Sequence, residues 1–126
     1  MNTTANSNLF VFETDIGTFR VCTTYQKSLY LCAALKDAGM QLSNTQLLIF
    51  EGVLQQMDFE RKFDATQSVV VINPDDESSV YEIFGKDYFN TSTLAALLST
   101  VFPRHQTCIR KNGEVESYYV SGVMYH

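Results

Sequence analysis

Three pairs of segments rich in β-branched and aromatic residues constrain the fold of this chain more than any other feature. The pairs are residues 9–14 with 18–24, 68–73 with 80–84, and 107–111 with 114–119. A short segment of turn residues joins each pair, and Asn112-Gly113 is the strongest hairpin signal among them. In the first turn, Gly17 is expected to take the left-handed conformation of a three-residue loop. The sequence therefore predicts three antiparallel β-hairpins.

The segment after the first hairpin has the periodicity of an amphipathic helix. Its apolar residues recur at i, i+3, i+4 and i+7, and they are Leu31, Ala34, Leu35 and Ala38. Gly39 follows, as is typical of the end of a helix. We therefore predict a helix over residues 25–38.

A capping box marks the start of a second helix. In Ser43-Asn44-Thr45-Gln46, the serine oxygen and the glutamine side chain each satisfy a backbone amide that has no partner within the helix. Apolar residues from Leu47 to Met57 then repeat at spacings of three and four. The pattern predicts a mostly buried helix over this segment.

A third helical pattern precedes the last hairpin, with apolar positions at Leu94, Leu97, Leu98 and Val101. The side chains of Asn90, Thr91 and Ser92 are suited to capping its start. Pro103 is expected to end it at Phe102, because the residue before a proline is disfavoured in the helical conformation.

The predicted order of elements is ββ-αα-ββ-α-ββ, which is typical of an α+β fold. We expect one antiparallel sheet with the helices packed mainly on one face. The run Val69-Val70-Val71-Ile72 is β-branched throughout, which favours a strand at the centre of the sheet or buried on both faces. A length of 126 residues with no linker indicates a single domain over residues 9–126, after a disordered polar N-terminus over residues 1–8.

The chain is acidic and contains enough apolar material for one core. It has 14 acidic and 9 basic side chains, a net charge of −5, and 45% hydrophobic residues. Such a balance disfavours direct binding to a nucleic-acid backbone. The first eight residues lack the features of a secretory signal, and no apolar run approaches the roughly 20 residues that span a bilayer. We therefore expect a cytoplasmic protein that binds neither membranes nor nucleic acid directly.

No catalytic or metal-binding pattern is recognisable in the sequence. Cys22, Cys32 and Cys108 are far apart and have no ligand partner at metal-binding spacing, so we expect them to be buried free thiols. The two histidines are His105, in a connecting segment, and His126, at the last position. The sequence predicts no catalytic residue, no metal and no cofactor, and hence no enzyme.

The excess negative charge belongs to the middle of the chain. Residues 64–102 carry six acidic side chains and one basic side chain, whereas the segments before and after them are close to neutral. A surface of this kind would steer a basic partner, or imitate phosphate toward a nucleic-acid-binding protein, or simply keep the chain soluble. The candidate residues are Asp75, Asp76, Glu77, Glu82 and Asp87.

Tyrosines near the end of the chain suggest a second binding surface, formed by Tyr118, Tyr119 and Tyr125. Neighbours on a strand point to opposite faces, so Tyr118 and Tyr119 cannot both be buried by one layer of helices. Tyrosine is enriched at protein interfaces. The last strand also lacks a protecting proline or lysine, which leaves it open to pairing with a second copy of the chain.

These features favour a small acidic cytoplasmic module that binds a protein and acts by occupying its surface. Inhibitors, immunity proteins, secretion chaperones and anti-defence proteins act in this way. One alternative is a small enzyme or ligand-binding protein, which a deep apolar pocket containing His105 would favour. The other is a structural subunit that forms a homodimer through its C-terminal strand.

Overall fold

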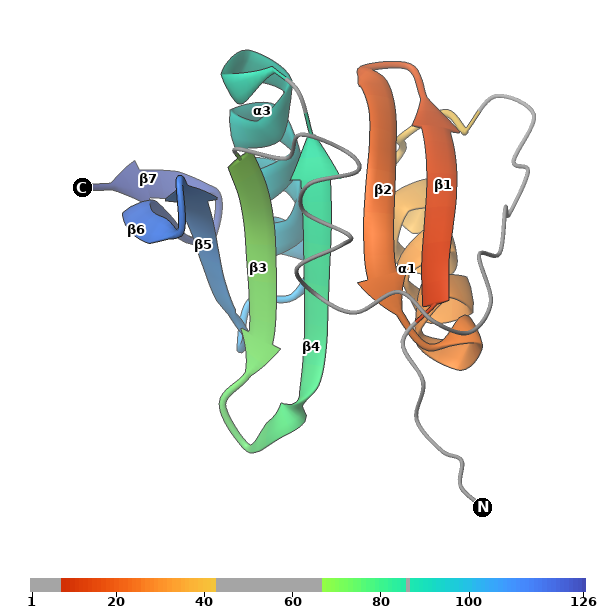
Figure 1. Ribbon diagram of the computed structural model, residues 1–126, viewed down its shortest axis with the longest axis horizontal. Helices are drawn as coiled ribbons and strands as arrows, with labels where there is room; N and C mark the ends of the chain where they lie inside the picture. Colours follow the sequence, from red (N-terminus) through yellow and green to blue (C-terminus); the bar gives the residue numbers. More distant parts are fainter. Residues whose placement is uncertain (1–7, 43–66, 86) are drawn as a thin grey trace.

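The computed structural model of the protein describes residues 8–42, 67–85 and 87–126. They form one antiparallel sheet of seven strands in the order β1-β2-β4-β3-β5-β6-β7, with two helices (Figure 1). The α+β class and the antiparallel sheet are thus as predicted. The predicted helix after Ser43 and most of the polar N-terminus lie outside the described residues.

The first hairpin joins β1 (Asn8–Thr14) to β2 (Gly17–Thr23). Thr14 pairs with Gly17, so the turn has two residues and the predicted three-residue loop is wrong. The Thr14 hydroxyl explains the tighter turn, because it donates to the Gly17 carbonyl at 2.8 Å and accepts from the Ile16 amide at 3.3 Å. Gly17 has a φ of +144° but lies in the strand.

Helix α1 (Tyr25–Asp37) follows β2 directly and confirms the first predicted helix. Thr24 caps its start by accepting a hydrogen bond from the Lys27 amide at 3.3 Å. Leu31 and Leu35, from the predicted apolar stripe, are buried. At the other end, Gly39 takes a φ of +91° and donates to the Lys36 carbonyl, which is the predicted glycine stop.

Strand β3 (Gln67–Asn73) lies fourth of the seven, between β4 (Asp76–Gly85) and β5 (Gln106–Lys111). Val69, Val70 and Val71 are all buried, which confirms the prediction of a central strand covered on both faces. The loop predicted over residues 74–79 is shorter than expected, because β4 already begins at Asp76.

Helix α3 (Tyr88–Val101) begins earlier than its sequence pattern suggested. Asp87 is the N-cap, and its carboxylate accepts from the Phe89 amide at 2.9 Å. The predicted caps Asn90, Thr91 and Ser92 therefore lie inside the helix. The Thr91 hydroxyl instead donates to the Asp87 carbonyl at 2.8 Å. The helix ends before the cap residue Phe102, as Pro103 predicted.

Strands β5 and β6 (Glu114–Val120) form the predicted hairpin around Asn112 and Gly113, both with positive φ. The chain then turns again at Ser121-Gly122 into β7 (Val123–Tyr125). The three predicted hairpins account for six strands, so the sequence did not predict β7, the seventh. The turn forms because Ser121 and Gly122 both adopt positive φ, which closes a two-residue hairpin.

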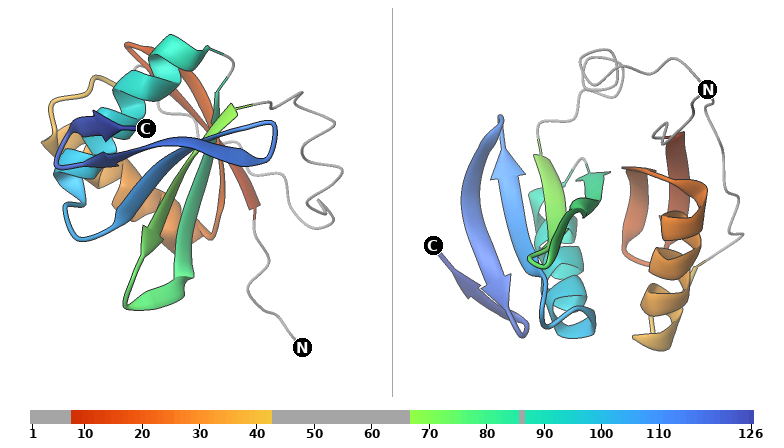
Figure 2. Two further views of the ribbon diagram at one scale, coloured as in Figure 1. Left: turned by 90° about the vertical axis from the view of Figure 1, so that its left-hand side faces the viewer. Right: turned by 90° about the horizontal axis from the view of Figure 1, so that it is seen from below.

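The main core lies between the sheet and the two described helices. Helix α3 packs against β3, β4, β5 and β6, and α1 packs against β2 and α3. Figure 2 shows both helices on the same side of the sheet. The largest side chains that are fully buried are Phe10, Phe12, Leu9, Leu31, Ile83, Leu94, Leu98 and Ile109.

Candidate functional site

The predicted acidic residues lie at three separate places. Asp75 is exposed in the turn between β3 and β4, and Asp76 and Glu77 begin β4. Asp87 caps α3 beyond the other end of the same strand. Nine residue steps along β4 correspond to about 30 Å. The structure therefore does not bring these four residues to one surface.

Glu82 is held within the sheet by a positive partner. Its carboxylate accepts from the Arg110 guanidinium at 3.1 Å and from the Ser68 hydroxyl at 3.3 Å. A second guanidinium nitrogen of Arg110 donates to the Gly113 carbonyl at 3.3 Å. Because the charge of Glu82 is balanced by a cation from β5, it adds little to an acidic surface.

Tyr118 and Tyr119 point to opposite faces of β6, as the strand periodicity predicted. Tyr118 is 44% exposed, whereas Tyr119 is 5% exposed. The Tyr119 hydroxyl is hydrogen-bonded to the Ser92 hydroxyl of α3 and also lies 3.3 Å from the Met124 sulfur. Tyr119 therefore fixes β6 to α3, and Tyr118 is the neighbour available for contact.

Tyr118 belongs to a group of exposed apolar side chains on the outer face of β6 and β7, the face turned away from α3. Tyr118 pairs with Tyr125, and their rings stack with centroids 5.5 Å apart. Each member of the group is between 44% and 60% exposed. We call it the C-terminal apolar face, and it consists of Val115, Tyr118, Val120, Val123 and Tyr125.

The strand register places these five side chains together. Val115 and Tyr118 pair with Arg110 and Cys108, which are two residues apart on β5 and so share a face. Val120 pairs with Val123, which is two residues before Tyr125 on β7. The tyrosines were predictable from the sequence but the three valines were not, because a register shift next to Arg110 and the unpredicted turn before Val123 hide their alternation.

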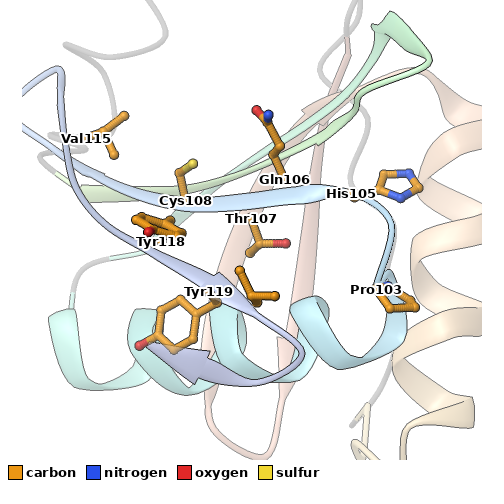
Figure 3. Close-up of a pocket in the computed structure, with 9 residues that line it drawn as sticks. Pro103, His105, Gln106, Thr107, Cys108, Val115, Tyr118 and Tyr119 are labelled. Atoms are coloured by element: carbon orange, nitrogen blue, oxygen red, sulfur yellow. The ribbon is translucent and has the colours of Figure 1, made fainter. Parts of the chain in front are cut away.

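A groove of about 460 Å³ runs along the same part of the sheet. Figure 3 shows it on β5 and β6, with Pro103 and His105 at one end and Val115 at the other. Among the described residues, no side chain that lines it is an acid, a lysine or an arginine. We call it the C-terminal groove, and its lining residues are Pro103, His105, Gln106, Thr107, Cys108, Val115, Tyr118, Tyr119 and Val120.

His105 and Cys108 both line the groove, but Figure 3 shows His105 at one end and Cys108 further along β5, so they do not form the pair that a cysteine nucleophile would need. Burial raises the pKa of the Cys108 thiol, which is the opposite of what activates a nucleophile. Burial also lowers the pKa of His105, and the charge of Asp75 opposes this only in part. His105 Nδ1 is buried with no hydrogen-bond partner among the described residues. Neither pKa shift prepares Cys108 to act as a thiolate nucleophile.

The three cysteines are free and half-buried. Within residues 8–42, 67–85 and 87–126, no three His, Cys, Asp or Glu side chains come together in a way that would hold a metal ion. Neither described helix has the length and apolar character needed to cross a membrane. Comparisons with models of protein families, with curated proteins and with solved structures found nothing that matches this chain.

Proposed function

We propose that this protein is a binding module for another protein and that its partner docks on the C-terminal apolar face and groove. The observation that carries the proposal is the gathering of five exposed apolar side chains around a concave surface whose described lining residues include no acid, lysine or arginine. Contiguous apolar surface of this kind is typical of interaction sites, and tyrosine is a frequent anchor in them.

The groove also suggests what the partner presents. Its walls are mostly aromatic and aliphatic, so the segment that enters it carries an aromatic or branched aliphatic side chain. Glu114 and Glu116 are exposed on the same strand and favour basic residues beside that side chain. Occupying a partner's surface in this way is the action of an inhibitor, an immunity protein, a chaperone or an anti-defence protein.

Site-specific photo-crosslinking in cells of the source organism tests the location of the interface. A benzoylphenylalanine in place of Tyr118 is expected to form a cross-linked product with one partner. The matched control is the same probe in place of Phe89, which is 74% exposed on α3, away from the groove. A product from position 89 and none from position 118 would contradict the proposal.

A pair of surface variants tests which residues supply the affinity. Tyr118→Ser/Val120→Ser is expected to weaken partner binding about tenfold or more, because two central apolar contacts are lost. The comparison variant is Asp75→Lys/Asp76→Lys/Glu77→Lys, which spans the turn between β3 and β4 and the start of β4. If this variant loses the partner while the first retains it, the interface is at the acidic turn instead.

A second candidate function is the binding of a small uncharged molecule. It is favoured by the ligand-like size of the groove and by His105, a lining residue whose Nδ1 has no hydrogen-bond partner among the described residues. Native mass spectrometry of the protein purified from its source checks it. A bound small molecule that is lost in Tyr118→Ser/Val120→Ser would support this candidate, and an unliganded mass would argue against it.

A further inference from the structure

Strand β7 forms one edge of the sheet. It pairs with β6 on one side, and none of the described residues pairs with its other side. Its three residues, Val123, Met124 and Tyr125, are 41–55% exposed. An exposed edge of this kind presents backbone donors and acceptors that can pair with another strand.

The turn before β7 determines which backbone groups point outward. Val120 and Val123 close a two-residue turn, in which the carbonyl of the first bonds the amide of the second. Antiparallel pairs alternate between hydrogen-bonded and non-hydrogen-bonded, so the next pair, Tyr119 and Met124, exchanges no backbone hydrogen bonds. The N–H and C=O of Met124 therefore point away from β6, toward the open edge.

We propose that β7 pairs with β7 of a second copy of this chain, antiparallel and centred on Met124. The two Met124 residues then exchange both backbone hydrogen bonds across the twofold axis. Val123 lies opposite Tyr125 of the second copy, which is a favourable pairing of a β-branched with an aromatic side chain. The result is a homodimer in which the two sheets are continuous.

The distribution of charge favours a second copy as the occupant of this edge. Residues 117–125 contain no acidic, basic or histidine side chain, and no proline, although the chain as a whole has a net charge of −5. Two copies therefore approach here without direct repulsion between like charges. The contact is short, so we expect a weak dimer that forms in a concentration-dependent way.

This inference goes beyond the proposed function, because it uses the edge of the sheet and not its face. In the dimer, Val123 and Tyr125 of the two copies are neighbours, so the two C-terminal apolar faces join into one surface. A partner with two apolar segments, or two partners, can then bind side by side.

Sedimentation velocity over a wide range of protein concentration tests the dimer. The wild type is expected to shift from monomer to dimer as concentration rises. Met124→Pro removes the outward N–H without removing a bond to β6, and we expect the dissociation constant to rise at least tenfold. Met124→Ala is the matched control, because it also loses the side chain but keeps the N–H, and it is expected to retain most of the affinity.

Oxidative cross-linking keeps the proposal testable if the proline variant does not fold. Residues that face each other in a hydrogen-bonded antiparallel pair have Cα atoms about 5.5 Å apart, which suits a disulfide. Met124→Cys is therefore expected to give a covalent dimer under mild oxidation. Phe89→Cys is the control, since it adds an exposed thiol elsewhere to the same three native cysteines.

Two results would overturn the dimer: a wild type that stays monomeric at all concentrations, or equal cross-linking of Met124→Cys and Phe89→Cys. Loss of the dimer and loss of partner binding can be distinguished, because different variants are expected to cause them. Tyr118→Ser/Val120→Ser is expected to lose the partner and keep the dimer, and Met124→Pro is expected to do the reverse.

Discussion

The environment of His105 differs from what its position in a connecting segment suggested. It follows α3, and its ring lies 5.0 Å from the ring of Phe102. Burial of the imidazole lowers its pKa, and Asp75 opposes the change. The predicted polar connector histidine is therefore partly packed against the core, with one ring nitrogen unpartnered among the described residues.

This environment predicts how stability depends on pH. The unfolded chain binds the His105 proton with an ordinary pKa of about 6.5, whereas the folded protein binds it less readily. The contribution of His105 to the free energy of unfolding is therefore fully present above about pH 6.5. It is lost as the pH falls toward the lowered pKa of the folded state. In urea unfolding, His105→Gln is expected to lose less unfolding free energy between about pH 7.5 and 5.5 than the wild type does.

His126→Gln is the matched control for this measurement, because it removes the other histidine, whose side chain is exposed at the last position. If His105→Gln and the wild type lose the same free energy over this range, burial of the imidazole does not govern the acid side of the stability curve.

At the scale of elements, two hairpin turns with nearly the same backbone differ in whether they can be predicted from the sequence, because they differ in one side chain. Asn112-Gly113 and Ser121-Gly122 have nearly the same backbone, with φ of 54° and 85° in the first and 51° and 86° in the second. Asparagine tolerates the left-handed conformation at the first position, but serine does so less readily. The first turn was therefore predictable, and the second was not.

The turn at Ser121 is held by a contact outside the hairpin. The Gly122 amide donates to the Ser99 hydroxyl of α3 at 2.7 Å, and this hydroxyl donates to the Ala96 carbonyl at 2.8 Å. A Cβ on Gly122 would lie 2.9 Å from the Thr100 hydroxyl. Tertiary contact with α3 thus stabilises a turn whose local sequence is unfavourable, which is why local sequence rules did not find β7.

Exchanging the two residues between the turns measures this local cost. Ser121→Asn is expected to raise the free energy of unfolding by about 0.5 kcal/mol, because asparagine adopts positive φ at lower cost. Asn112→Ser is expected to lower it by a similar amount. Chemical denaturation of both variants checks the signs. Two changes of the same sign would mean that contacts with α3, and not the backbone conformation, decide which residue suits each turn.

At the start of α3, too, tertiary contacts decide a boundary that local sequence preference does not determine. The sequence offered Asn90, Thr91 and Ser92 as caps, and the structure uses Asp87. All four residues have suitable side chains, so local preference could not choose among them. Burial of Thr91 against the sheet, with its hydroxyl bonded to the Asp87 carbonyl, requires the helix to begin a turn earlier.

At the scale of the whole molecule, the order of the strands in the sheet could not be predicted from the sequence. Hairpin signals identify which strands are consecutive neighbours, but β2 pairs with β4, and β3 pairs with β5, across long stretches of chain. The candidate site, in contrast, lies on β5, β6 and β7, in which each strand pairs with its neighbour along the chain. Alternation along β6 predicted that one of Tyr118 and Tyr119 is exposed. The C-terminal groove could not be predicted in this way, because the register between β5 and β6 decides that His105, Tyr118 and Val120 line the same groove.

The arrangement of charge over the whole molecule also differs from the sequence-based expectation. The described acidic residues of the middle segment are spread along β4 and at its two ends, and Glu82 is paired with Arg110. Residues 117–125, which carry no charged side chain, in contrast lie together, because they comprise β7 and the C-terminal half of β6. For the proposed dimer, we therefore expect negative charge to act as a general repulsion and apolar surface to supply the specific contact.

This division predicts an unusual effect of salt on the proposed dimer. Two copies with a net charge of −5 repel each other, and the β7 contact contains no ion pair that salt could weaken. With domain centres about 28 Å apart, the repulsion in about 50 mM salt is roughly 0.5 kcal/mol, and it nearly vanishes in about 500 mM salt. The dimer dissociation constant is therefore expected to fall about twofold over this range. Sedimentation velocity at both salt concentrations measures it, and a dimer that weakens with salt would indicate an interface held by charged residues, away from β7.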